Sequence, residues 1–158
     1  IITLMAIAML FPITAFAQAY VQTWDLVDSG KHLDYDGNST YMSYINTGAA
    51  TWNAYKSGVI RKDSAFVVED VYVSDVNASN GWAGMTYSSG KIELNTYYMS
   101  GYSNSKKQNV ATHELGHALG LDHSTSTDVM DAAITGHTST QALSQNDKDS
   151  YDAAYNNY

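Results

Sequence analysis

The chain of 158 residues carries 16 acidic and 8 basic residues, a formal net charge of −8 at pH 7, and no cysteine. This acidic balance argues against nucleic-acid binding, because phosphate contacts need Lys and Arg. The lack of cysteine excludes disulfides and thiolate zinc ligands. The surplus carboxylates could bind Ca²⁺, which prefers oxygen ligands, or form a solvated acidic surface.

The first residues have the composition of an export signal. Residues 1–16 are apolar and uncharged, a run too short to span a bilayer comfortably, and small residues follow it. We predict a signal peptide over residues 1–19, cleaved after Ala17 or Ala19, whose basic start precedes the given sequence. The alternative is a buried helix of the domain. A secreted, extracellular protein follows from the signal, and the lack of cysteine favours bacterial export.

The remaining residues, 20–158, suit one soluble domain without stable membrane insertion, because no second apolar run approaches membrane length. Residues 21–35 alternate apolar and polar side chains, which predicts a first strand, and residues 36–39 predict a turn. Apolar residues recur at helical spacing over residues 40–56, which predicts an amphipathic helix that stops near Gly58.

Three strands are expected next. Residues 64–76 are rich in Val and aromatic side chains. Residues 82–87 and 91–98 predict a hairpin with its turn at Ser88, Ser89 and Gly90. Gly81 and Gly84 indicate an edge strand that another group approaches closely, or a bulge.

Two helices complete the pattern. Ser105 and Gln108 match a capping box that begins a helix, and Gly120 is suited to end it in a left-handed turn. A loop follows. Ser144 and Asp147 repeat the capping pattern and predict a final helix. The order strand, helix, several strands, helix, loop, helix indicates an α+β fold.

The predicted second helix carries a metal-binding pattern. His113 and His117 are four residues apart, so their imidazoles project from one helix face and can bind one zinc ion. Glu114 lies beside the first ligand, where it can accept a proton from zinc-activated water without being a ligand itself. Gly120 then reverses the chain, and His123 supplies a third nitrogen. Three protein ligands leave an open position, as in catalytic zinc sites.

This H-E-x-x-H-x-x-G-x-x-H segment resembles the metzincin signature, and Ser124 directly after it is similar to the matrixin branch. Met130 resembles the methionine of the metzincin turn, whose thioether forms an apolar floor below the zinc. The L-S-x-x-D pattern at residues 143–147 is similar to the start of the last matrixin helix. The resemblance implies a zincin-like catalytic domain: a twisted mixed β-sheet with a backing helix, an active-site helix, and a small C-terminal subdomain.

The resemblance also implies a zinc-dependent endopeptidase that acts as a monomer on extended peptide or protein substrates. It holds one catalytic Zn²⁺, and Glu114 acts as general base. Residues Ala83, Gly84 and Met85 would form the cleft rim, where a peptide pairs with the strand through main-chain hydrogen bonds. Asn109 matches a position that lines the S1′ pocket in the family, although a solvated helix residue is an equal alternative.

Several features depart from the family pattern. The segment after Met130 lacks the usual Pro, which leaves the S1′ wall undefined. No histidine lies between Asp34 and Val110, so we expect no second, structural zinc. A cysteine switch is impossible without cysteine. Asp147 is expected to cap its helix or to brace the methionine turn.

Two other functions fit the same residues. A zinc-stabilised binding module without turnover would not need the carboxylate of Glu114. A zinc-dependent hydrolase of cell-wall amides would have a narrow cleft without an edge strand. Either would keep the three histidines.

Overall fold

The computed structural model describes residues 18–64 and 68–158. Its strands are β1 (Leu33–Gly37), β2 (Ile60–Lys62), β3 (Val71–Val76), β4 (Gly84–Tyr87) and β5 (Lys91–Asn95). Its helices are α1 (Met42–Asn53), α2 (Thr96–Met99), α3 (Asn104–Ala118), the short 3-10 helix η1 (Ile134–Gly136) and α4 (Gln145–Tyr155).

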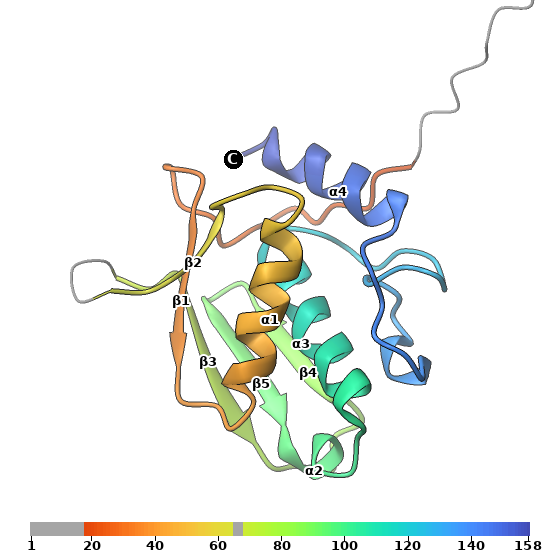
Figure 1. The fold of residues 1–158 in the computed structure, drawn as a ribbon. Coiled ribbons are helices and arrows are strands. Elements are labelled where there is room, and N and C mark those ends of the chain that lie inside the picture. Colours follow the sequence, from red (N-terminus) through yellow and green to blue (C-terminus); the bar gives the residue numbers. More distant parts are fainter. Residues whose placement is uncertain (1–17, 65–67) are drawn as a thin grey trace, which may run out of the picture.

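The strands form one mixed sheet in the order β2-β1-β3-β5-β4. All neighbouring pairs are parallel except β4 and β5, which form an antiparallel hairpin with Tyr87 opposite Lys91. The hairpin and the mixed α+β sheet confirm the predictions. Strand β4 forms one edge of the sheet, and this edge lies beside α3 (Figure 1).

Helices α1 and α3 pack against each other beside the sheet (Figure 1). Trp52 of α1 is fully buried, and its indole Nε1 donates a hydrogen bond to the Thr112 carbonyl of α3 over 2.9 Å. Its ring also packs edge-on against Tyr151 of α4. The core beneath these contacts is formed by Leu33, Ile45, Val73, Ile92, Leu94 and Leu115.

The predicted first strand over residues 21–35 is wrong for most of its length, because β1 begins only at Leu33. Its earlier part lies along the end of α3 instead. Gln22 N donates to the Gly120 carbonyl over 2.7 Å, and Leu26 N donates to the Ala118 carbonyl over 2.9 Å. The carbonyls in the last turn of a helix have no partner within the helix. The segment therefore pairs with a helix end, which gives the same half-buried pattern as a strand.

The segment over residues 20–26 also connects the two ends of the domain. Tyr20 N donates to Ser150 Oγ of α4 over 2.9 Å, and the Tyr20 carbonyl accepts from Asp122 N over 2.9 Å. This contact joins α4 to the residue before His123.

The limits of the active-site helix differ from the prediction at one end only. Ser103, not Ser105, is the N-cap, and its Oγ accepts from Lys106 N over 3.3 Å. Both serines have the β-hydroxyl that capping needs, so the sequence could not separate them. At the other end Gly120 has φ +85°, and Leu121 N donates to the Gly116 carbonyl. This left-handed turn confirms the predicted stop.

The ends of several other elements differ from the predicted ends by a few residues. The predicted strand over residues 64–76 begins only at Val71, and residues 65–67 lie outside the described part of the chain. Strand β2 was not predicted because three residues carry little pattern. Strand β5 stops at Asn95, whose side chain accepts from Tyr97 N and begins α2. The capping box of α4 is present as predicted, with Ser144 and Asp147 as partners.

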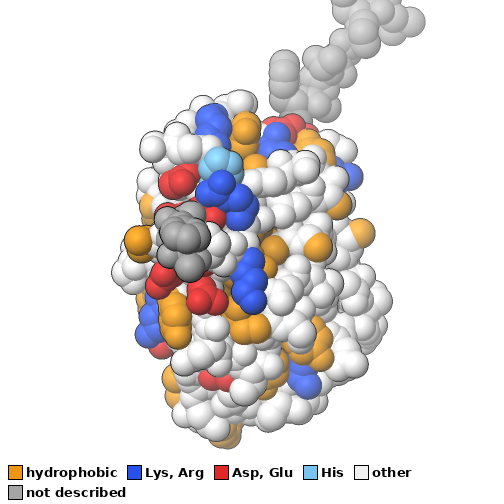
Figure 2. Space-filling model, turned by 60° about the vertical axis from the view of Figure 1, so that its left-hand side comes forward, with side chains coloured by type: hydrophobic (Ala, Val, Ile, Leu, Met, Phe, Trp, Pro, Cys, Tyr) orange, Lys and Arg blue, Asp and Glu red, His pale blue; other side chains and the backbone are white. Residues whose placement is uncertain are grey.

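The surface around β1 and β2 mixes charges of both signs with scattered hydrophobic side chains (Figure 2). No helix in residues 18–64 and 68–158 is long and apolar enough to cross a membrane.

Candidate active site

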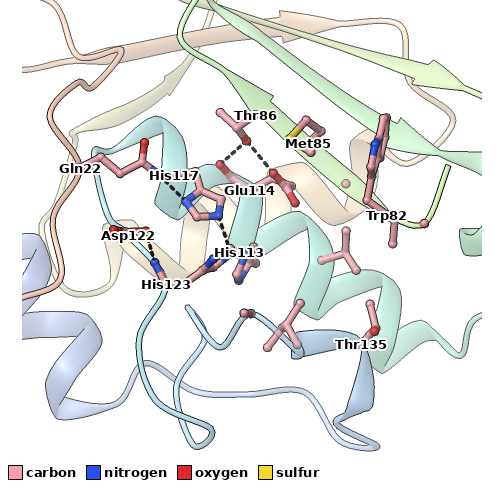
Figure 3. Close-up of a pocket in the computed structure, with 16 residues that line it drawn as sticks. Gln22, Trp82, Met85, Thr86, His113, Glu114, His117, Asp122, His123 and Thr135 are labelled. Atoms are coloured by element: carbon pink, nitrogen blue, oxygen red, sulfur yellow. Dashed lines mark hydrogen bonds between the residues drawn. The ribbon is translucent and has the colours of Figure 1, made fainter.

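Three histidines converge where α3 ends and the chain reverses. His113 and His117 lie on α3, and His123 follows the turn at Gly120. One ring nitrogen of each lies within 4.8 Å of the others. The Nε2 atoms of His117 and His123 are 3.2 Å apart (Figure 3). Two nitrogens bound to one tetrahedral zinc ion lie ~3.3 Å apart, given Zn–N bonds of about 2.0–2.1 Å.

A backbone carbonyl contacts Nδ1 of each helical histidine. His113 Nδ1 lies 2.8 Å from the Val129 carbonyl, and His117 Nδ1 lies 2.8 Å from the Leu121 carbonyl. A carbonyl only accepts, so the proton of His113 is on Nδ1 and its Nε2 lone pair is free for a metal. His117 Nδ1 is contacted by both the Leu121 carbonyl and the Gln22 amide nitrogen, and its Nε2 faces His123. The Gln22 amide also donates to the Leu121 carbonyl over 2.9 Å and lies against His117.

Burial keeps both helical imidazoles neutral. It lowers the pKa of His113 to about 3 and that of His117 to about 4, and the neighbouring histidines add to the effect. Neutral imidazole is the form that binds metal ions. Three imidazole nitrogens without a thiolate or carboxylate ligand are a donor set that fits zinc, and a fourth position stays open.

Glu114 turns away from the histidines toward β4 and is only 5% exposed. Its Oε2 accepts a hydrogen bond from Thr86 Oγ1 over 2.7 Å (Figure 3). Burial raises the pKa of Glu114 to about 7, although the Thr86 hydrogen bond acts in the opposite direction. The carboxylate is thus a buried group that is not part of the histidine cluster.

Gly84 makes room for this carboxylate. A Cβ atom at Gly84 would lie 2.5 Å from Glu114 Oε1 and 2.8 Å from its Cδ. Real Cβ contacts are longer than this, so a larger residue would displace Glu114. The close approach expected at Gly84 is therefore made by Glu114 of the protein itself.

Met130 is 1% exposed and lies against α3, between the positions of His113 and His117 in the helix. It packs against Gly116, where an added Cβ would lie 2.3 Å from the methionine sulfur. The carboxylate of Asp147 holds the turn, because it accepts from Val129 N over 2.9 Å and from Met130 N over 3.1 Å. Asp147 therefore both caps α4 and braces the methionine turn.

A cleft of about 390 Å³ opens above these residues. Ala83, Gly84 and Met85 line one side of it, as expected, together with Trp82 and Thr86. The opposite wall is formed by Ala132, Ile134 and Thr135.

Asn109 is not among the residues that line the cleft. Its side chain is buried against the loop over residues 139–141, because it donates to the Ser139 carbonyl and accepts from Gln141 N, each over 2.9 Å. It therefore supports the loop behind the wall. This burial excludes the solvated position considered from the sequence, and the S1′ position stays a prediction.

A hydrogen bond between His137 and Asp131 shapes the wall after Met130, where the usual Pro is absent. His137 Nε2 lies 2.8 Å from Asp131 Oδ2, and Asp131 Oδ1 accepts from Ala133 N. These contacts close the loop that contains η1. Thr86, Gln22 and the wall residues were not identified from the sequence, since their roles depend on contacts between distant segments.

The described residues contain one other group suited to metals, formed by Asp28, Asp34 and Asp70. Both oxygens of Asp34 already accept from Arg61, at 2.8 and 2.6 Å. Asp70 accepts from Asp34 N, and Asp28 accepts from backbone N–H groups. The expected use of acidic residues for Ca²⁺ stays a prediction.

Comparison with known proteins agrees with this geometry. A crystal structure of archaemetzincin from Methanopyrus kandleri has the same fold, with a TM-score of 0.58 and 12% sequence identity. The similarity covers 82% of this chain and 99% of that one. A comparison with curated proteins gave no match. The matrixin family profile matches residues 14–156. The chain therefore belongs to the matrixin family of zinc-dependent peptidases.

Proposed function

We propose that the protein is a zinc-dependent endopeptidase in which Glu114 is the general base. One arrangement carries the proposal: three imidazoles converge at one end of a cleft, and a buried carboxylate that is not a ligand lies beside them. His113, His117 and His123 would hold the ion. A bound zinc ion supplies a Lewis acid and lowers the pKa of a coordinated water.

The residues of the chain account for the remaining chemistry. Glu114 takes the proton from the attacking water and passes it to the amine that leaves. The helix fixes Glu114 next to His113, and the buried Met130 packs against Gly116 of the same helix. These side chains are held before substrate arrives, which reduces the cost of orienting the reacting groups.

The edge strand supports a peptide as substrate. Strand β4 lies at the edge of the sheet, and its residues line the cleft. An extended peptide can bind there as an added strand by main-chain hydrogen bonds. This edge disfavours a cell-wall amide hydrolase, for which a cleft without an edge strand was expected. The buried carboxylate of Glu114 disfavours a binding module without turnover.

We further propose that the enzyme is secreted and works as a monomer formed by residues 20–158. The apolar residues 1–16 and the small residues that follow support export. One chain supplies the three histidines, Glu114 and the edge strand, so the site needs no residue from a second copy. Ca²⁺ binding by the acidic surface is a separate proposal that a calorimetric titration would test.

A protein digest tests the peptidase proposal. Purified protein, its Glu114→Gln variant and a Glu69→Gln control would be incubated with casein and gelatin, before and after chelation and zinc addition. Glu69 is exposed and lies outside the cleft. We expect cleavage by the wild type and the control, loss with the chelator, and recovery with zinc. Full activity of Glu114→Gln would reject the role of Glu114, and no cleavage by zinc-loaded wild type would reject the peptidase.

A further inference from the structure

We infer that Thr86 is a positioning residue that fixes the rotation of the Glu114 carboxylate. Its hydroxyl occupies one carboxylate oxygen, so the other is free for the cleft. The inference rests on the proposed role of Glu114 as general base, and it adds a residue that the metal-binding motif does not contain.

The hydroxyl of Thr86 has two acceptors within reach on the same residue. Oγ1 lies 2.7 Å from Glu114 Oε2 and 2.9 Å from the Glu114 carbonyl. A hydroxyl has one proton to donate, and an ionised oxygen is the stronger acceptor. The shorter contact is the one to the carboxylate. Thr86 therefore holds Oε2 and bridges β4 to the backbone of α3.

The second oxygen, Oε1, is in a different environment. It accepts no hydrogen bond from the described residues, and Glu114 is among the residues that line the cleft. Oε1 is therefore the oxygen left for a group bound in the cleft. Oε1 also lies against Gly84, which leaves space on that side of the carboxylate. The two oxygens of Glu114 thus have separate roles, one held by Thr86 and one available to a water molecule.

The strand geometry makes this arrangement stable. Gly84 and Thr86 are two residues apart, so both face the same side of β4. Their positions are set by the hairpin, in which Gly84 pairs with Leu94 and Thr86 pairs with Ile92. A glutamate has three side-chain torsions to order. Without the hydroxyl, the strand would still provide space for Glu114 but would not select one rotation.

Four variants separate positioning from folding: Thr86→Val, Thr86→Ser, Glu114→Gln and Thr47→Val. Valine keeps the shape of threonine and removes the hydroxyl, and serine restores it. Thr47 is an exposed α1 residue whose hydroxyl bonds only within its helix, so Thr47→Val is the matched control. For each variant we would measure kcat and KM on a fluorogenic peptide, the zinc content, and the melting temperature.

We expect Thr86→Val to lose kcat by about 10- to 100-fold, because misoriented catalytic groups cost that much. KM and zinc content should stay within twofold, and Thr86→Ser should recover most of kcat. The inference is overturned if zinc-loaded Thr86→Val keeps wild-type kcat, or if serine does not restore it. If Thr86→Val does not fold, kcat of Thr86→Ala is compared with kcat of Thr86→Ser instead. Equal kcat values in these two variants would overturn the inference.

The outcome also separates this inference from the proposed function. If Glu114→Gln is inactive and Thr86→Val is fully active, the role of Thr86 is rejected and the role of Glu114 as general base is kept. An active Glu114→Gln would remove the general base, and the Thr86 inference with it.

Discussion

The carboxylate of Asp147 accepts a hydrogen bond from the backbone N–H of Met130, over 3.1 Å. A residue of the last helix therefore holds the backbone of Met130, which packs against Gly116 of α3. The same carboxylate accepts from Val129 N, and the Val129 carbonyl in turn lies 2.8 Å from His113 Nδ1. Helix α4 is thus connected to His113 through Asp147 and Val129.

This connection predicts that Asp147→Ala destabilises the protein strongly. The change leaves the N–H groups of Val129, Met130 and Ser144 without their acceptor. We expect a loss of about 3 kcal/mol or more in the free energy of unfolding, because each buried unsatisfied donor costs roughly 1–3 kcal/mol. Urea unfolding measures this loss in the free energy of unfolding. Asp149→Ala on the same helix is the control and should change stability by less than about 1 kcal/mol. Equal stability of the two variants would contradict the bracing role.

Gly84→Ala should abolish most activity while the fold persists. The added Cβ would lie 2.5 Å from Glu114 Oε1, so the carboxylate has to rotate away. We expect activity to fall by about 100-fold, the cost of a displacement of about 1 Å in an active site. The control is Gly101→Ala, where an added Cβ meets only the Tyr98 carbonyl at 3.8 Å. Peptide cleavage measures the activity of the two variants, and circular dichroism measures whether they are folded. Wild-type activity in Gly84→Ala would refute the close fit between Gly84 and Glu114.

Metal analysis should find one zinc ion per chain. The prediction follows from the single group of three histidines in residues 18–64 and 68–158. His117→Ala should lose zinc and activity together, because two imidazoles bind more weakly than three. His32→Ala changes an exposed loop histidine outside the cluster and should keep both. Atomic absorption after dialysis gives the ratio of zinc to protein. A second tightly bound zinc ion would show that another site exists.

Stability should fall in acid partly through Asp128. Burial alone would raise the pKa of Asp128, but side-chain hydrogen bonds, including those of Thr125 and Asn146, lower it from the ordinary 3.8 to about 2. The unfolded state thus takes up a proton at higher pH than the folded state does. The stabilisation is complete above pH 3.8 and is lost as the pH falls toward 2, by about 2 kcal/mol in total.

Urea unfolding of wild type and Asp128→Asn at about pH 5 and about pH 2 tests this dependence. The variant is expected to be less stable at the higher pH and to lose less stability on acidification. An identical pH dependence in both proteins would show that Asp128 is not responsible.

The parts of the site that were predictable are local in sequence. His113 and His117 share a helix face because of their spacing, and Gly120 ends the helix because it tolerates a positive φ. The capping box at Ser144 was also visible, since both partners lie within one turn. Such features need only neighbouring residues, so a pattern is enough to place them.

The unpredicted parts depend on tertiary contacts. Thr86 lies 28 positions from Glu114, and Gln22 lies 95 positions from His117. Neither residue is unusual within its own segment, so no local signal marks it. Residues 21–32 were misassigned because alternation reports half-burial, which a helix end provides as well as a neighbouring strand. The contacts of Asn109 were not predicted, because its partners, Ser139 and Gln141, belong to a loop without a pattern.

The hydrogen bond between Tyr20 and Ser150 joins residues 130 positions apart, and Tyr20 in turn holds Asp122 beside the third histidine. A growing chain that has already made the whole motif still lacks the support that α4 gives to that loop. The loop that contains the third histidine is therefore complete only when the last helix has been synthesised.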